Sequence, residues 1–137
     1  MHRSLPGGAS RRVLWFIGVG CVAAAVHWAV VVVLVEHLRW HPLLANLVGW
    51  LVAFSVSFNG HHRLSFRGHA APVARSAVRF FWVSAAGFAV NETAYALLLQ
   101  VSAVRYDGLL AVVLVAVAFV TYWLSRHWAF LRSQADA

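Results

Sequence analysis

Four long apolar runs take up most of this 137-residue chain and restrict its fold more than any other feature. We expect helical spans at residues 13–35, 42–60, 80–102 and 108–126. A helix that rises ~1.5 Å per residue needs about 20 residues to cross a hydrocarbon core of ~30 Å. The bilayer core offers no water to the backbone, so such runs must be helical. The sequence therefore predicts an all-α polytopic membrane protein with four transmembrane helices in a single domain, residues 1–137.

Composition supports a lipid environment. Hydrophobic residues make up 62% of the chain and charged residues 11%, whereas about 25% of the residues of soluble proteins are charged. The first run follows a basic start, as the apolar part of a signal peptide does. It exceeds the usual length of about 7–15 residues for that part, so we expect it to be a retained span.

Arginine placement predicts the orientation. Nine of the eleven arginines lie at the N-terminus, between the second and third spans, or after the fourth; Arg39 and Arg105 lie in the two short opposite loops. Loops rich in arginine stay in the cytoplasm. We therefore expect a multi-pass protein of the inner (cytoplasmic) membrane with cytoplasmic N- and C-termini. The net charge of +7 fits contact with anionic membrane lipids better than binding of nucleic acid.

Two basic, aromatic segments look like copies of each other. Residues 58–66 and 122–130 lie 64 positions apart and share an aromatic residue, a histidine–arginine pair and a final phenylalanine. Each follows a long apolar run. A unit used twice sets the architecture of a chain, so we expect two parallel helical-hairpin repeats, at about 12–67 and 79–132. Both repeats would end on the cytoplasmic side.

The basic and aromatic residues at these ends are candidates for binding a lipid-linked phosphate. Arginine forms paired hydrogen bonds with phosphate. The candidate phosphate ligands are Arg12, His62, Arg63, Arg79, Arg126 and His127. The candidate contacts to a prenyl chain or the membrane interface are Phe58, Phe66, Trp123, Trp128 and Phe130. The alternative, a topology anchor with an aromatic belt, stays open because both roles use the same residues.

Glu92 is the most unusual residue, because it lies inside the third span beside Asn91. An intramembrane carboxylate is costly and by default indicates function. We expect Asn91 and Glu92 to contact a sugar or to couple transport to protons. His27 lies at similar depth in the first span and is the candidate partner of Glu92. The structural alternatives are a protonated Glu92 and a neutral His27, each hydrogen-bonded to a neighbouring helix.

Other kinds of chemistry find no support in the sequence. We identify no nucleophile–base–acid set, no glycine-rich phosphate loop and no spacing of metal ligands. Cys21 is the single cysteine and sits in the first span, where it fits as a small packing residue. We therefore expect a protein that is not an enzyme and uses neither a cofactor nor a metal.

The repeated ends also resemble those of the GtrA-like family of small four-span membrane proteins. Residues 125–130, Ser-Arg-His-Trp-Ala-Phe, are close to the family's ending, and residues 61–66 depart from it at Leu64 and Ser65. The opening of the first span at residues 16–20 is also similar. The resemblance covers about residues 12–130. It implies a role in cell-envelope polysaccharide synthesis, commonly as a flippase for a polyprenyl-phosphate-linked sugar.

The leading hypothesis is therefore translocation of a polyprenyl-phosphate-linked monosaccharide across the cytoplasmic membrane. One alternative is a non-transporting adaptor that positions a membrane glycosyltransferase. A second is a proton-coupled small multidrug-type exporter, which would use an intramembrane glutamate but not the basic–aromatic ends. A chain of 137 residues leaves little room for a groove, so we expect a homo-oligomer, a dimer or higher.

Overall fold

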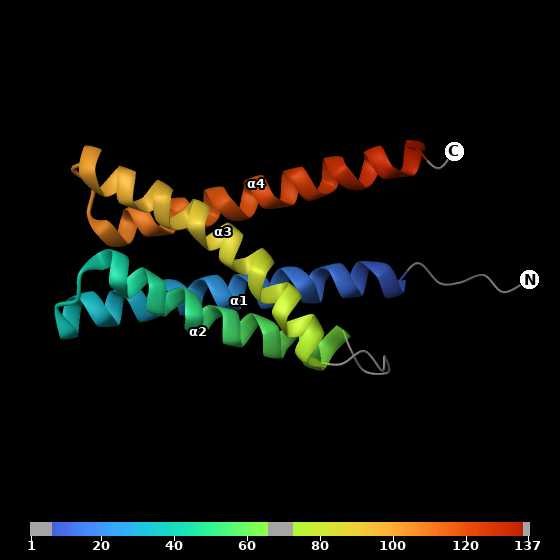
Figure 1. Cartoon of the computed structure of the whole chain (residues 1–137), viewed down its shortest axis with the longest axis horizontal. Helices are drawn as coiled ribbons and strands as arrows, with labels where there is room; N and C mark the ends of the chain where they lie inside the picture. Colours follow the sequence, from blue (N-terminus) through green and yellow to red (C-terminus); the bar gives the residue numbers. More distant parts are fainter. Residues whose placement is uncertain (1–6, 66–72, 136–137) are drawn as a thin grey trace, which may run out of the picture. The chain divides into compact units, whose positions relative to one another are not determined.

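The computed structural model describes the backbone of residues 7–65 and 73–135 and the side chains of residues 14–60 and 77–123. Over these residues the chain forms four helices and no strand, which confirms the predicted all-α class (Figure 1). The helices are α1 (Gly7–Leu38), α2 (Pro42–Ser65), α3 (Val73–Val101) and α4 (Tyr106–Ala135). Each extends past the predicted apolar run at one end or both.

Three of the described helices are long and apolar enough to cross a bilayer. These segments are Leu14–Leu38, Pro42–Gly60 and Tyr106–Trp123. The third predicted span lies in α3, which has 29 residues and so has the length of a span. It does not reach the same hydropathy, because Asn91 and Glu92 interrupt its apolar run. The helix that departs from the prediction is thus the one that carries the candidate polar site.

A tight turn joins α1 to α2. Arg39 has a φ of 56°, in the left-handed region that ends many helices and is usually occupied by glycine. Pro42 is the first residue of α2, where its missing N–H costs no hydrogen bond. The Nδ1 atom of His41 accepts a hydrogen bond of 3.3 Å from the Leu43 N–H. These local features reverse the chain within a few residues.

The chain divides into two compact units, Met1–Ala85 and Ala86–Ala137. The first unit holds α1, α2 and the first part of α3, and the second holds the rest of α3 and α4. Helices α1 and α2 form an antiparallel hairpin, and α3 and α4 are joined by a second tight turn (Figure 1).

Small residues bring α1 and α2 close together. A Cβ atom added to Gly49 would lie 2.6 Å from the His27 Cδ2 atom and 2.8 Å from the Val31 Cγ2 atom. Ala45 and Ala53, one turn to either side of Gly49, are also buried. Close approach of backbones at small residues is how helices gain packing energy in lipid. This contact fixes the register of the first hairpin.

The core of the second unit uses larger side chains. Tyr95 and Leu110 are fully buried, and Leu109 and Val113 are nearly so. The Tyr95 hydroxyl donates a hydrogen bond of 3.1 Å to the backbone carbonyl of Tyr106, at the start of α4. A polar group on α3 is therefore satisfied by the backbone of the next helix.

Candidate functional site

His27 makes its hydrogen bonds inside the first hairpin. Its Nε2 atom lies 2.7 Å from the Asn46 Oδ1 atom and 3.2 Å from the Asn46 backbone oxygen. A carbonyl oxygen only accepts, so Nε2 carries the proton and donates. His27 is 5% exposed and Asn46 is fully buried. This geometry matches the structural alternative, a histidine hydrogen-bonded between helices. Asn46, which the sequence analysis did not single out, is its partner.

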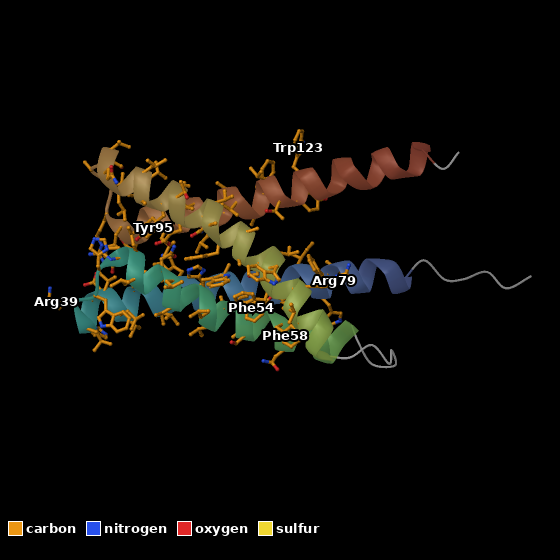
Figure 2. All side chains as sticks on the ribbon, viewed as in Figure 1. Arg39, Phe54, Phe58, Arg79, Tyr95 and Trp123 are labelled. Atoms are coloured by element: carbon orange, nitrogen blue, oxygen red, sulfur yellow. The ribbon has the colours of Figure 1, made fainter. Side chains whose placement is uncertain are left out.

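An aromatic cluster packs α2 against the first part of α3 (Figure 2). Phe54 stands at its centre, with ring centroids 5.6 Å from those of both Phe80 and Phe81. Phe58 stacks on Phe54 at 6.1 Å and lies 6.0 Å from Phe80. Trp50 adds a hydrogen bond of 2.9 Å from Nε1 to the Ser84 hydroxyl. Phe58, a candidate contact for a prenyl chain, therefore already packs within the protein on one side.

The other candidate aromatic residues divide by what the structure describes. Trp123 in α4 is 52% exposed, so its ring is open to surrounding lipid or to a lipid ligand. Phe66, Trp128 and Phe130 lie outside the described side chains. The role assigned to this set stays a prediction.

Among the six basic candidates, Arg79 has a described side chain. It is exposed and directly precedes Phe80, a member of the aromatic cluster. Figure 2 shows it on the same stretch of the first unit as Phe54 and Phe58, far from Arg39 at the turn between α1 and α2. Its assignment as a phosphate ligand stays a prediction. The side chains of Arg12, His62, Arg63, Arg126 and His127 lie outside the described residues, although their backbones are helical.

Asn91 and Glu92 lie well inside α3, in the second unit. The Asn91 side chain is 4% exposed, whereas Glu92 is half-buried. Tyr95, one turn after Asn91, is fully buried. Thr93 donates a hydrogen bond of 2.8 Å to the Ala89 carbonyl of its own helix. Asn91, Glu92 and Tyr95 thus form a polar stretch on an otherwise apolar helix, and we call these three residues the α3 polar stretch.

Sequence reasoning missed several residues that the structure brings together. Phe54 lies between Trp50 and Phe58 at a spacing of four residues, so helical periodicity was the signal for the aromatic cluster. Asn46 and Tyr95 gave a weaker signal, since each is one polar residue near a helix end. In lipid such residues usually bind a neighbouring helix.

The arrangement agrees with a comparison to known families. The sequence profile of the GtrA/DPMS transmembrane domain matches residues 15–130, which include all of α2 and α3 and most of α1 and α4. No curated protein and no solved structure matches the chain. The match covers well over half of the sequence and confirms the resemblance noted at the repeated ends. The chain therefore belongs to the GtrA/DPMS transmembrane domain family and is a multi-pass membrane protein of the kind involved in glycan-related processes.

Proposed function

We propose that the protein translocates a polyprenyl-phosphate-linked monosaccharide across the cytoplasmic membrane for cell-envelope polysaccharide synthesis. A sugar that crosses hydrocarbon unaided loses its hydrogen bonds to water, and each unpaired polar group costs several kcal/mol. The task needs polar groups at membrane depth and a cation for the phosphate. It needs no bond to be made or broken.

The α3 polar stretch is the observation that carries this proposal. Glu92 is half-buried beside the buried Asn91 on a helix within the matched transmembrane domain. Intramembrane carboxylates are rare and face a bundle interior or a water-filled path. His27 already donates to Asn46, so we assign contact with the sugar or a proton to Asn91 and Glu92 and leave His27 a packing role.

We assign the phosphate to the basic residues at the cytoplasmic ends of the helices. Arg79 supports this assignment because it is exposed beside the aromatic cluster. Arg12, His62, Arg63, Arg126 and His127 would surround the same membrane face. The prenyl chain would stay in lipid against exposed aromatic residues such as Trp123. In a homo-oligomer, a second copy of the chain would form the side of the translocation groove that one small chain lacks.

Translocation in proteoliposomes tests the proposal. Fluorescent polyprenyl-phosphate-linked monosaccharides would be placed in the inner leaflet, and their appearance outside followed by quenching with a membrane-impermeant reductant. Wild type is expected to move at least one of these lipids, and Glu92→Gln and Arg79→Gln to slow it at least tenfold. Thr93→Ala is the matched control, because Thr93 binds the backbone of its own helix.

The outcomes separate the three candidate functions. Wild type without translocation, but required for glycan assembly in cells, would favour the adaptor. Proton-driven export of organic cations that depends on Glu92 and not on Arg79 would favour the multidrug-type exporter. Full translocation by Glu92→Gln would show that the carboxylate is structural.

A further inference from the structure

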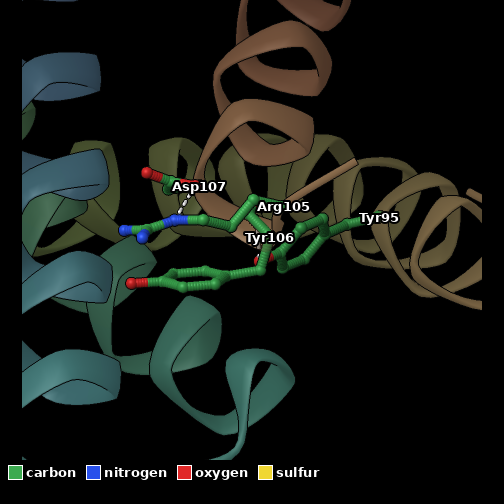
Figure 3. A network of polar contacts seen from close by, with 4 residues as sticks. All are labelled: Tyr95, Arg105, Tyr106 and Asp107. Atoms are coloured by element: carbon green, nitrogen blue, oxygen red, sulfur yellow. Dashed lines mark hydrogen bonds and ion pairs between the residues drawn. The ribbon is translucent and has the colours of Figure 1, made fainter. Parts of the chain in front are cut away.

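The turn between α3 and α4 carries a compact set of polar side chains at the end of the second unit farthest from the C-terminus. The Arg105 Nε atom donates a hydrogen bond of 2.9 Å to the Asp107 Oδ1 atom. The guanidinium carbon of Arg105 lies 5.6 Å from the centre of the Tyr106 ring. Figure 3 shows the guanidinium and the Tyr106 ring side by side, extending from the turn in the same direction. We call Arg105, Tyr106 and Asp107 the turn triad.

Backbone and side-chain hydrogen bonds hold the turn triad in place. The buried Tyr95 hydroxyl donates to the Tyr106 carbonyl at 3.1 Å, and the Leu109 N–H donates to the Arg105 carbonyl at 3.1 Å. On the α3 side, the Ser102 hydroxyl accepts a hydrogen bond of 3.1 Å from the Val104 N–H. Groups fixed before binding lose less entropy when a ligand arrives. The triad is thus positioned as a ready-made contact surface.

Exposure shows that the ion pair faces outward. The side chain of Arg105 is 66% exposed and that of Asp107 is 24% exposed. Ion pairs this open contribute little to stability because water screens them. The position of Arg105 also differs from that of most arginines, since nine of the eleven lie at the N-terminus, between the second and third predicted spans, or after the fourth. The ion pair itself therefore adds little to stability, and topology does not require an arginine at this position.

The chemistry of the turn triad suits neighbouring hydroxyl groups better than an anion. Arg105 and Asp107 cancel in charge, and the carboxylate repels a phosphate. Two adjacent hydroxyls of a sugar ring satisfy both partners, because one donates to the carboxylate while the other accepts from the guanidinium. The Tyr106 ring adds an apolar surface beside them.

We propose that the turn triad binds the sugar ring of the lipid-linked substrate through neighbouring hydroxyls, on the face opposite the phosphate-binding residues. This assignment deepens the proposed translocation and rests on it for the natural ligand. A sugar that reaches this turn from the membrane would form hydrogen bonds with side chains that are already in position. These hydrogen bonds would take the place of hydrogen bonds to water. The site thereby stabilises the headgroup on the extracytoplasmic side.

Ligand-observed NMR on the full chain in lipid nanodiscs tests the site. The probes are the methyl glycosides of glucose, mannose and galactose. Hydroxymethyl-tetrahydropyran, which lacks neighbouring ring hydroxyls, and inorganic phosphate are the control ligands. With few hydrogen bonds available, we expect a Kd on the order of 1 mM for at least one glycoside. Asp107→Asn and Arg105→Gln should each weaken it at least tenfold, and Arg39→Gln, which removes the same charge from the other short loop, should not.

Each remaining outcome decides the matter. Arg105→Lys keeps the charge but loses the Nε geometry, so it should also weaken binding while circular dichroism shows an intact helical fold. The proposal is overturned if no glycoside binds wild type, if Asp107→Asn binds as well as wild type, or if phosphate binds more tightly than the glycosides. Translocation without glycoside binding would remove only this site. Glycoside binding without translocation would remove only the proposed transport.

Discussion

Replacing Gly49 with alanine would probe the closest contact in the first hairpin. The added Cβ would stand 2.6 Å from the His27 Cδ2 atom, 2.8 Å from the Val31 Cγ2 atom and 3.0 Å from the His27 backbone oxygen. None of these atoms yields easily. The imidazole ring is held by Asn46, valine is stiff about χ1, and the oxygen belongs to helix α1. The two helices must therefore move apart or shift.

The magnitude follows from two opposing terms. Overpacking a close-packed contact costs about 1–3 kcal/mol. Alanine regains about 1 kcal/mol of helix propensity over glycine. Gly49→Ala is thus expected to lower the free energy of unfolding by up to about 2 kcal/mol. Gly20→Ala gains the same propensity at a position where nothing lies within 4 Å, so propensity cancels between the two variants. Their difference should be about 1–3 kcal/mol.

Reversible unfolding in mixed micelles, followed by far-UV circular dichroism as the fraction of denaturing detergent rises, measures this difference. Gly87→Ala is a second control, because its added Cβ also meets nothing within 4 Å. Equal stability of Gly49→Ala and Gly20→Ala would refute the close approach of α1 and α2 at this residue. A loss shared by all three variants would point instead to a general effect of alanine.

Three further predictions use the same unfolding measurement. His27→Ala should lose about 1–2 kcal/mol, because the buried Asn46 loses a donor, and His27→Ala with Asn46→Ala should cost less than the sum of the two single changes. Trp50→Phe should lower the free energy of unfolding by about 0.5–1.5 kcal/mol, because its hydrogen bond to Ser84 is lost. Adding Ser84→Ala to Trp50→Phe should then cost little more, and fully additive losses would contradict that hydrogen bond. Arg39→Gly should gain about 1 kcal/mol by relieving the left-handed backbone, whereas Arg39→Ala, which keeps a Cβ, should gain nothing.

Hydrophobic runs predicted the helices well because burial in lipid requires every backbone group to be paired within its own segment. They predicted the ends less well. Helix α3 begins at Val73, ahead of the predicted residue 80, and continues through the polar Asn91 and Glu92. Hydropathy reports how a residue partitions into lipid, whereas a helix once begun continues through polar residues as long as its backbone hydrogen bonds persist.

The pairing of side chains was harder to predict, because it depends on how the helices rotate against each other. His27 and Asn46 are 19 residues apart on two helices, and their contact requires a defined register across the turn. That register depends on Gly49 and on the left-handed Arg39, a position where the sequence lacks the usual glycine. Because no glycine marks this turn, the sequence alone was equally consistent with a partner for His27 on another helix.

The two hairpins bury the same positions with different chemistry. At the offset of 64 residues, Ala45, Asn46 and Gly49 of α2 correspond to Leu109, Leu110 and Val113 of α4, and all six are buried. Leucine and valine are bulkier than the alanine and glycine at the corresponding positions of the first unit. Each unit also has a buried asparagine, but on different helices of the hairpin: Asn46 lies on α2 and Asn91 lies on α3. In the first unit, the side-chain oxygen of Asn46 accepts a hydrogen bond from His27. We infer that these larger side chains hold the second interface wider and so make it the better place to admit a polar headgroup. Exchanging Val113 for glycine should then slow translocation by narrowing that interface.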